Sequence, residues 1–509
     1  MRRTRILSQW AFGLFFIYLF MNTRYLGADV IAYPVNAFFR LDPLAGIGSI
    51  LGGRKTPLFF WPLLILLPAV ALFGRFFCGW ICPMGSMLDL FGRRSRNRSP
   101  APEGKYYRIK EIVLIFLLGT SLFSLNLTGI VDPLSLLIRS FAMGVVPPLE
   151  RFISSFFDIT YRVGGPLRAA TEPLYGWLTD HVLSFYLPVF RYTVFFLGLI
   201  VVIIALELVE RRFWCRNLCP LGALLGWFSW IAPLGLKVSE GCDACAKCPP
   251  TCRMGAIEYE EKMVIRAKDC ILCYDCQDAC PDGVITHHPG NAGVPENASF
   301  VSLSRRQFLV GAGIGAVFPL TVGSTSRPDN LPPYLIRPPG AVSEAEFLAL
   351  CLRCGECMRV CLTNGLQPTL FEAGIEGMWT PRLVSRVGYC EYSCTLCGQV
   401  CPTGAIASLD RVFKRKVRIG TAVINRNLCI PFVKPEECLV CEEHCPIPKK
   451  AIVFDHAAVA GPKGPVVVKQ PRIIEDLCIG CGICEKKCPL DGESAVRITN
   501  RGEDRAGSM

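Results

Sequence analysis

Residues 270–281 read Cys-Ile-Leu-Cys-Tyr-Asp-Cys-Gln-Asp-Ala-Cys-Pro, so Cys270, Cys273, Cys276 and Cys280 follow the spacing C-x2-C-x2-C-x3-C. Three thiolates two residues apart can wrap one metal–sulfur cluster in a tight loop, whose backbone amides then point toward the inorganic sulfides. The fourth cysteine points elsewhere, and the proline after it stops the loop from continuing as a helix. The same spacing recurs in three further quartets, which are Cys242, Cys245, Cys248 and Cys252; Cys351, Cys354, Cys357 and Cys361; and Cys478, Cys481, Cys484 and Cys488.

Two more quartets vary this spacing but keep C-x2-C-x3-C at their end. They are Cys390, Cys394, Cys397 and Cys401, with a wider first gap, and Cys429, Cys438, Cys441 and Cys445, in which the first cysteine stands well ahead. The repeat is the signature of bacterial ferredoxins and predicts about six 4Fe-4S clusters. Because the fourth cysteine of a two-cluster ferredoxin ligates the other cluster, we assign one cluster to Cys242, Cys245, Cys248 and Cys280, and its neighbour to Cys270, Cys273, Cys276 and Cys252.

Other uses of these thiols fit the spacing less well. The chain has 28 cysteines and 5 histidines, and soft sulfur ligands select iron–sulfur clusters or zinc. Four-coordinate zinc needs two pairs separated by a longer loop, and disulfides need wider sequence separation than these quartets offer. No C-x-x-C-H motif occurs and no expected membrane span contains a histidine, so we expect no haem.

Long apolar runs precede residue 235, whereas most cysteines follow it. The runs at 10–21, 57–73, 112–127 and 189–209 predict four membrane spans, the first of them alternatively a cleaved signal. The net charge of +12 is concentrated beside these runs, as in Arg93, Arg94, Arg96, Arg98 and Lys105, which indicates membrane topology rather than nucleic-acid binding. An amino terminus in the cytoplasm then places the first ferredoxin-like block in the cytoplasm.

The remaining cysteines form two C-x3-C-P pairs, which are Cys78 with Cys82 and Cys215 with Cys219. They lie where the second and fourth expected spans meet the cytoplasmic surface. Three interpretations stay open: a seventh metal site with four ligands, a redox-active thiol pair, and structural thiols at the interface. Glu207, at the end of the fourth span, either handles protons or pairs with Arg211 or Arg212.

Leu303-Ser-Arg-Arg-Gln-Phe-Leu309 precedes a short apolar run that ends near Val322, which is typical of a twin-arginine export signal. The run is closer to a signal sequence than to a full span, so cleavage and retention as a fifth span both stay open. A proline-rich linker follows, and then the block with sixteen cysteines.

The sequence therefore predicts an α-helical membrane domain with four spans, and an open fifth, joined to two α+β ferredoxin-like domains. The expected boundaries are 1–235 for the membrane domain, 236–295 for a cytoplasmic two-cluster domain, 303–323 for the signal or anchor, 324–343 for the linker and 344–500 for an exported four-cluster domain. We find no zincin motif, phosphate loop or activated nucleophile, so no site that converts a substrate is visible.

On these motifs, residues 1 to about 290 resemble the NapH-type membrane ferredoxins, and residues from about 303 onward resemble the NapG/MauM-type exported ferredoxins. The resemblance implies a fusion of the two in a bacterial inner membrane, with the carboxy-terminal domain in the periplasm. It implies a quinol dehydrogenase module that takes electrons from quinol or menaquinol and feeds a periplasmic reductase or cytochrome subunit. The alternatives are a NosR-like maturation factor for a periplasmic metalloenzyme and a structural or assembly subunit.

Overall fold

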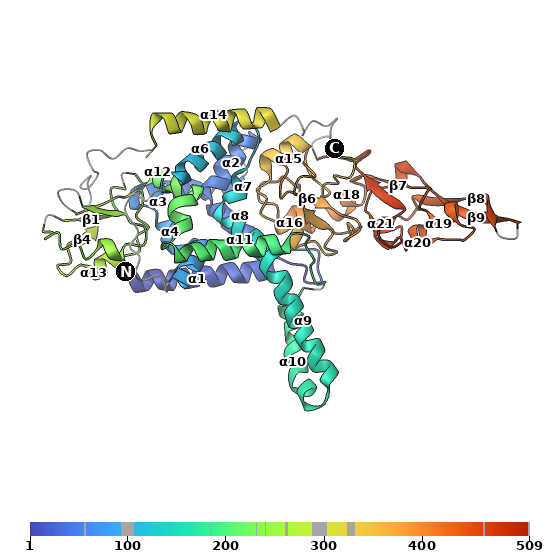
Figure 1. Cartoon of the computed structure of the whole chain (residues 1–509), viewed down its shortest axis with the longest axis horizontal. Coiled ribbons are helices and arrows are strands. Elements are labelled where there is room, and N and C mark those ends of the chain that lie inside the picture. The colour runs from blue at the N-terminus through green and yellow to red at the C-terminus, as the bar shows by residue number, and fades with distance from the viewer. Residues whose placement is uncertain are drawn as a thin grey trace.

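The computed structural model describes residues 1–54, 58–92, 106–184, 186–230, 232–239, 241–259, 263–287, 303–322, 331–461 and 464–506. Three parts follow one another along the long axis of the molecule (Figure 1). A helical core, formed by the described residues up to 230 together with 303–322, lies in the middle. The amino-side unit, residues 232–287, lies at one end of this core, and the carboxy-side unit, residues 331–506, lies at the other.

The helical core contains twelve α-helices before residue 230 and one after it, with short irregular turns between them. They are α1 (Arg2–Asn22), α2 (Pro43–Gly53), α3 (Leu63–Phe73), α4 (Phe76–Trp80), α5 (Pro83–Phe91), α6 (Ile109–Leu122), α7 (Thr128–Val131), α8 (Pro133–Ser140), α9 (Val146–Val163), α10 (Gly165–His181), α11 (Thr193–Ala205), α12 (Pro220–Phe228) and α14 (Arg305–Val322). The turns are η1 (Val35–Leu41), η2 (Leu58–Phe60), η4 (Phe141–Val145), η5 (Leu206–Leu208) and η6 (Trp214–Leu218).

Apart from α7 and the hairpin of α9 and α10, the core is built from two halves that share an order of elements. Each half has an apolar helix, a short helix that starts at Asp-Pro, a second apolar helix and a C-x3-C-P turn that starts a last helix. Asp42 caps α2 through the amides of Leu44 and Ala45, and Asp132 caps α8 through the amide of Ser135 at 2.7 Å. Proline at the first helical position suits both starts, because its fixed φ is helical and no amide is lost.

Only α1, among the helices that the structure describes, is both long enough and apolar enough to cross a membrane. The expected spans at 57–73, 112–127 and 189–209 contain shorter helices, of 11, 14 and 13 residues. Pro62 precedes α3, and a tight turn ends α11, which shortens both helices. Four spans therefore stay a prediction, and the basic loop from Arg93 to Lys105 lies outside the described residues.

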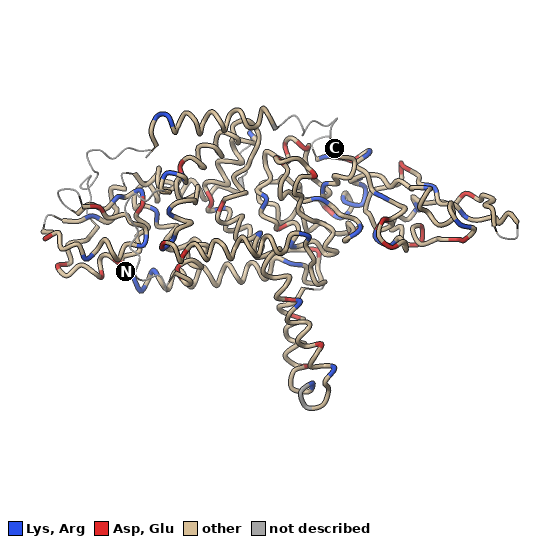
Figure 2. Tube along the Cα trace, in the orientation of Figure 1, with Lys and Arg blue, Asp and Glu red and all other residues tan. Residues whose placement is uncertain are grey.

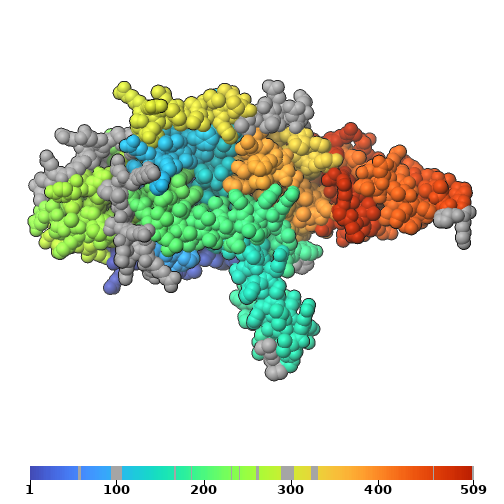
Figure 3. Space-filling model, in the orientation of Figure 1, coloured from blue at the N-terminus to red at the C-terminus, as the bar shows by residue number. Residues whose placement is uncertain are grey.

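Helix α14 lies along the outside of the core against α6 (Figures 1 and 3). The two backbones approach closely where glycines meet, since a Cβ on Gly119 would lie 3.2 Å from the Cα of Gly315. The rings of Phe116 and Phe318 pack edge to face beside this crossing, with their centroids 5.6 Å apart. Helix α14 thus runs from the end of the core that carries the amino-side unit toward the end that carries the carboxy-side unit. Helices α9 and α10 form a hairpin that projects sideways from the core.

The amino-side unit has the short paired strands of a small two-cluster domain. Strand β1 (Leu236–Val238) pairs antiparallel with β4 (Ile285–His287), and β2 (Ile257–Tyr259) pairs antiparallel with β3 (Met263–Ile265). A 3-10 turn, η7 (Pro249–Thr251), and helix α13 (Asp275–Ala279) fill the two cysteine loops. Residues 288–295 of the expected domain lie outside the described residues.

The carboxy-side unit consists of short helices and three antiparallel strand pairs. The pairs are β5 (Leu366–Pro368) with β6 (Pro381–Leu383), β7 (Thr421–Ile424) with β10 (Val496–Thr499), and the long hairpin β8 (Ile452–Gly461) with β9 (Gly464–Ile473). The helices are α15 (Glu344–Leu350), α16 (Glu356–Arg359), α17 (Leu396–Gln399), α18 (Arg411–Lys414), α19 (Ile430–Val433), α20 (Val440–Glu443) and α21 (Ile483–Lys487), with the turn η9 (Glu475–Leu477).

Candidate iron–sulfur sites and the buried thiols between them

The cysteines of the amino-side unit surround two cavities, and each cavity draws its fourth cysteine from the other quartet. One cavity is lined by Cys242, Cys245, Cys248 and Cys280. The second is lined by Cys252, Cys270, Cys273 and Cys276, together with apolar side chains such as Ile257 and Ile265. This crossed grouping is the one that two-cluster ferredoxins use.

The first two quartets of the carboxy-side unit are crossed in the same way. A cavity is lined by Cys361, Cys390, Cys394 and Cys397. The buried thiols of Cys351, Cys354 and Cys357 face Cys401, whose charge acts on Cys354 and Cys357. Each loop therefore contributes three thiols to one group and one thiol to its neighbour.

The last two quartets form the remaining groups, and they include the cysteine that stands far ahead of its companions in sequence. Cys484 lies near Cys478, Cys481 and Cys445, and Cys429 lies near Cys438 and Cys488. Cys429 immediately precedes helix α19, and both it and Cys441 are buried. Folding thus brings Cys429 to its group although the sequence separation is large.

The loops between the cysteines turn their amides toward the thiols. Ala244 and Ala246 lie at φ of 52° and 54°, and Leu272 and Tyr274 at 52° and 61°, which is the left-handed conformation that tightens such loops. In four groups a backbone amide also donates to a thiol: Ala256 to Cys252 at 3.2 Å, Leu366 to Cys361 at 3.5 Å, Ile406 to Cys401 at 3.4 Å and Ala422 to Cys478 at 3.4 Å. Hydrogen bonds of this kind help set the potential of a sulfur-ligated centre.

Burial makes these cysteines poor free thiolates but good ligands. It raises the pKa of Cys481 to about 12 and that of Cys248 to about 11, because a charged sulfur is poorly solvated there. A bound metal reverses this preference, since a coordinating thiol is deprotonated outright. Within the described ranges, no three His, Cys, Asp or Glu side chains are placed to hold a single metal ion. The donor set, four thiols around a cavity with amides aimed at the sulfurs, fits a polynuclear cluster.

The four cysteines of the C-x3-C-P pairs meet inside the helical core. Cys78 lies in α4 and Cys215 in η6, whereas Cys82 and Cys219 cap the starts of α5 and α12. All four are buried and belong to one continuous packed cluster. The amide of Gly222 donates to the Cys219 sulfur at 3.3 Å.

Two buried arginines brace these turns across the two halves. The Arg212 guanidinium donates to the Cys78 carbonyl at 3.0 Å and to the Gly85 carbonyl at 3.2 Å, and it pairs with Asp89 at 2.8 Å. The Arg75 guanidinium lies 4.0 Å from the Cys78 sulfur. It also lies against Gly222, where a Cβ would be 2.5 Å from a guanidinium nitrogen of Arg75. Each arginine therefore reaches the glycine that follows the opposite cysteine pair.

The amino-side unit sits directly on these turns. The indole nitrogen of Trp80 donates to the Leu272 carbonyl at 3.0 Å, and a side chain at Gly79 would collide with the Ile271 carbonyl. Asp269 fixes the same loop, since it accepts from Lys110 at 3.0 Å and from Tyr107 at 2.6 Å. The loop that carries Cys270 and Cys273 is thereby held against the thiols of the core.

The carboxy-side unit docks on the opposite end of the core through the loop after Cys351. The Arg353 guanidinium is buried and donates to the Asn126 carbonyl, to the Glu376 carbonyl at 2.7 Å and to the Cys351 carbonyl at 3.1 Å. Arg139 of α8 donates to the Arg353 carbonyl at 2.8 Å. Only glycine fits at position 129, where the Leu352 carbonyl occupies the place of a side chain.

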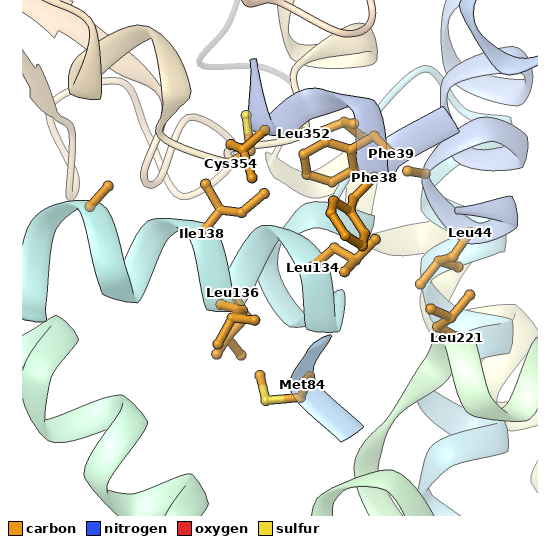
Figure 4. Close-up of a cluster of buried hydrophobic side chains, with 14 of the residues drawn as sticks. Phe38, Phe39, Leu44, Met84, Leu134, Leu136, Ile138, Leu221, Leu352 and Cys354 are labelled. Atoms are coloured by element: carbon orange, nitrogen blue, oxygen red, sulfur yellow. The ribbon is translucent and has the colours of Figure 1, made fainter. Parts of the chain in front are cut away.

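Between the two cysteine regions the core is filled with apolar side chains. Leu352 and Cys354 of the docked loop lie beside Phe39 and Ile138, while Met84 and Leu221, next to the C-x3-C-P turns, line the other side of the same cluster (Figure 4). The cluster is continuous and includes the four core thiols together with Cys351 and Cys354. Packed protein therefore connects the core thiols to the first group of the carboxy-side unit.

Glu207 is buried next to the C-x3-C-P region. One of its carboxylate oxygens accepts from the backbone amide of Arg212 at 2.9 Å. The predicted pairing with Arg211 or Arg212 thus takes the form of a backbone contact, while the Arg212 guanidinium is directed to Asp89. Arg305 and Arg306 of the expected twin-arginine motif begin helix α14.

Several residues that hold these sites in place were not predicted from the sequence. They are Arg75, Arg139, Arg353 and the helix-capping residues Asp42 and Asp132. Some of these residues belong to short patterns that occur twice in the sequence. The pattern Arg-Phe-(Phe/Trp)-Cys occurs at 75–78 and again at 212–215, and Asp-Pro-Leu occurs at 42–44 and again at 132–134. A search for internal repeats reveals both patterns.

Comparisons with known proteins match these regions. Models described as 4Fe-4S binding domains match residues 56–101, 191–238 and 397–420, and, for a second model, residues 471–491. The methylamine utilization ferredoxin-type protein MauM of Methylorubrum extorquens is 40% identical over 172 residues, which cover 33% of this chain and 73% of the relative. The ferredoxin-type protein NapG of Escherichia coli is 32% identical over 203 residues, or 38% of this chain and 84% of NapG.

A more distant relative matches over a longer stretch. The regulatory protein NosR of Pseudomonas aeruginosa is 26% identical over 306 residues, which cover 55% of this chain but 34% of NosR. No solved structure matches the chain.

Proposed function

This chain belongs to the MauM and NapG ferredoxin-type proteins, and from that we propose that it is a membrane-bound iron–sulfur protein that carries electrons from the quinol pool to a periplasmic reductase. Its ferredoxin-type 4Fe-4S domains make electron transfer the general activity. The observation that carries the proposal is the arrangement of the three parts. A cysteine loop of each ferredoxin-like unit is fixed directly against one end of an apolar helical core.

The surface of the core supports its place in a membrane. Large apolar side chains are exposed along α1, α3, α11 and α14, among them Leu14, Leu64, Val194, Val202 and Leu320. In Figure 2 the charged residues gather in the two end units and near the ends of the core, while the middle of α1, α11 and α14 is free of them. Large exposed apolar patches on a protein surface often mark contacts with a membrane or a partner. We place the bilayer around this belt, with the two units on opposite sides.

The proposed orientation of the amino terminus gives each unit a side of the membrane. With the amino terminus in the cytoplasm of a bacterial inner membrane, the amino-side unit faces the cytoplasm and the carboxy-side unit the periplasm. Helix α14 then begins with Arg305 and Arg306 on the cytoplasmic side and crosses as the last span. Its Gly-to-Gly packing on α6 supports retention rather than cleavage, since small residues let membrane helices approach closely.

The 24 cysteines of the six groups are the proposed cluster ligands. Bound 4Fe-4S clusters would supply single-electron redox chemistry at these positions. The chain contributes the burial of the sulfurs, the amides that donate to them and the packed core between the groups. We expect quinol to bind where the core meets the lipid, and a periplasmic reductase or cytochrome subunit to contact the carboxy-side unit.

The match to NosR favours a second candidate function. A protein with this architecture can deliver electrons for the maturation or activation of a periplasmic metalloenzyme rather than for respiratory turnover. The two candidates predict the same clusters and differ in the acceptor. Deleting the gene should abolish a respiratory reductase activity in the first case, but leave an inactive, incompletely assembled metalloenzyme in the second.

The central test uses full-length protein purified without oxygen. We expect about four irons and four sulfides for each cluster group, and reduction of the cluster signals in electron paramagnetic resonance after addition of menaquinol. Stoichiometric zinc, or fewer than about four irons per chain, would disprove the iron–sulfur assignment. Clusters that are present but unchanged by menaquinol would instead point to the structural or assembly role.

A further inference from the structure

The helical core carries the same eleven-residue pattern in each of its halves. Residues 75–85 read Arg-Phe-Phe-Cys-Gly-Trp-Ile-Cys-Pro-Met-Gly, and residues 212–222 read Arg-Phe-Trp-Cys-Arg-Asn-Leu-Cys-Pro-Leu-Gly. The arginine, both cysteines, the proline and the last glycine coincide. In both copies the first cysteine lies in a helical turn and the second caps the next helix.

The two copies face each other, so four thiols from distant segments converge. Each of the four is at most 8% exposed. Arg212 of the second copy donates to the Cys78 carbonyl of the first at 3.0 Å, and Arg75 of the first lies against Gly222 of the second, so the two cysteine turns are adjacent. No single segment supplies four cysteines here. A cluster at this place would take one pair of ligands from each half.

The arginines provide the charge that thiolate ligands need. Arg75 lies 4.0 Å from the Cys78 sulfur and also acts on Cys219, while Arg212 acts on Cys215 and Cys78. Both guanidiniums are almost completely buried. A positive group beside a buried cysteine stabilises its thiolate, which is the form that binds metal. Arg212 also pairs with Asp89 and Arg75 with Asp269, which holds both guanidiniums in place beside the thiols.

From this convergence we propose that Cys78, Cys82, Cys215 and Cys219 together ligate an additional iron–sulfur cluster inside the helical core. Zinc also accepts four cysteine ligands, and the metal content of the wild-type protein distinguishes it from a cluster. Four-cysteine ligation is the donor set of both 2Fe-2S and 4Fe-4S clusters. The match of 4Fe-4S binding models to residues 56–101 and 191–238, one copy each, agrees with the larger cluster.

The four-cysteine site lies between the amino-side unit and the carboxy-side unit. On one side the Cys270 loop contacts it through Gly79 and Trp80. On the other side Met84 and Leu221 begin the apolar cluster that reaches Leu352 and Cys354. Without a centre here, electrons would have to cross the whole core in one step. The inference deepens the proposed function and rests on its iron–sulfur assignment, but it does not depend on the donor or the acceptor.

The test compares full-length wild type with the double variant Cys82→Ser/Cys219→Ser, both purified without oxygen. Met84→Leu is the matched control, since Met84 is buried between the same elements and has no thiol. We expect the double variant to lose about four irons and four sulfides per chain, or two of each for a 2Fe-2S cluster, and one signal in a redox titration followed by paramagnetic resonance. The control should lose none, and the signals of the other groups should persist in both variants.

Native mass spectrometry of the wild-type chain makes the test independent of how well the variant folds. Seven clusters per chain support the proposal, and six overturn it. An unchanged iron content in a folded double variant overturns it as well, and so does a disulfide or zinc at these cysteines in the wild type. Loss of all clusters from the wild-type protein would instead disprove the proposed function, so the two failures are distinguishable.

Discussion

Buried arginines hold the carboxy-side unit to the core, and each uses its several donors on backbone carbonyls. Arg353 joins Asn126 of the core to Cys351 and Glu376 of the unit, and Arg139 returns a contact to the Arg353 carbonyl. The sequence reveals the cysteines beside these residues because metal ligation imposes a local spacing. It does not reveal the arginines, because the contacts that they make across the interface join residues more than 200 positions apart and follow no local pattern.

Replacing Arg353 with alanine should destabilise the docked unit strongly. Four carbonyls, those of Asn126, Cys351, Glu376 and Met378, lose a donor, and each hydrogen bond to a charged group contributes about 1.5–3 kcal/mol. We expect a clear fall in the melting temperature of the detergent-solubilised protein and faster proteolysis of the carboxy-side unit. Arg472→Ala is the control, because Arg472 is 57% exposed and its pair with Asp455 contributes at most about 1 kcal/mol. Equal stability of the two variants would refute this role of Arg353.

A second buried pair makes stability depend on pH. Arg337 donates to Glu344 at 3.0 Å, and this contact together with nearby Arg505 holds the pKa of the Glu344 carboxyl below its ordinary value of 4.5, despite the opposing effect of burial. A lowered folded-state pKa means that the stabilisation is complete above the ordinary value and is lost as pH falls through the folded-state value.

The variant Glu344→Gln should therefore be less stable than wild type at pH 7, and the difference should shrink as the pH is lowered below about 4.5. Unfolding curves measured from pH 7 to pH 3 test this, with Glu493→Gln as the control, because Glu493 is exposed and pairs only at the surface. A difference that stays constant over this range would show that the carboxylate charge of Glu344 is not what stabilises the fold.

At the scale of elements, the twin-arginine helix is a packed part of the structure. The sequence predicts its apolar character but leaves its fate open, because a signal and an anchor share the same composition. The partner helix could not be predicted either, since Gly119 of α6 lies against Gly315 and no pattern within α14 identifies this partner. Cleavage or retention of α14 stays a prediction. The need for glycine at position 129 could not be predicted either, because the carbonyl that excludes a side chain there belongs to the distant carboxy-side unit.

A bulky residue at the helix crossing should separate α14 from α6. Gly315→Leu places a side chain where a Cβ already lies 3.0 Å from the Phe116 carbonyl, so we expect a lower melting temperature and easier proteolysis next to α14. Gly313→Leu is the matched control, because a Cβ there meets no atom within 4 Å. If both variants behave like wild type, α14 does not depend on this contact.

At the scale of the whole molecule, the domain order could be predicted from the sequence, but the direct seating of both units on one core could not. Cysteine spacing and apolar runs are local features, and they indicate separate domains joined by linkers. The seating depends on surfaces formed only after folding, such as the Trp80 contact with Leu272 at one end and the Arg139 contact with Arg353 at the other. The number of spans stays a prediction, since the helices after α1 are short.

Because both units contact the same core, we predict that electrons pass from one unit to the other across the bilayer. In sealed proteoliposomes with one orientation of the protein, a membrane-impermeant reductant outside should reduce clusters of the enclosed unit. We expect Cys82→Ser/Cys219→Ser to slow this reduction at least tenfold while the outer clusters are reduced normally. Freeze-quenched paramagnetic resonance separates the two populations. Reduction confined to the outer unit in the wild type would show that the units are not connected.

Because α14 links the two units within one polypeptide, a cell that makes this chain makes both units in equal numbers. Where two separate polypeptides must find each other in the bilayer, their pairing depends on expression levels and on dilution by growth. Here one peptide chain runs from the last strand of the amino-side unit through α14 to the carboxy-side unit, so the ratio is one to one at any abundance. Both units are also seated on the same core, so a partner that binds either unit gains access to both.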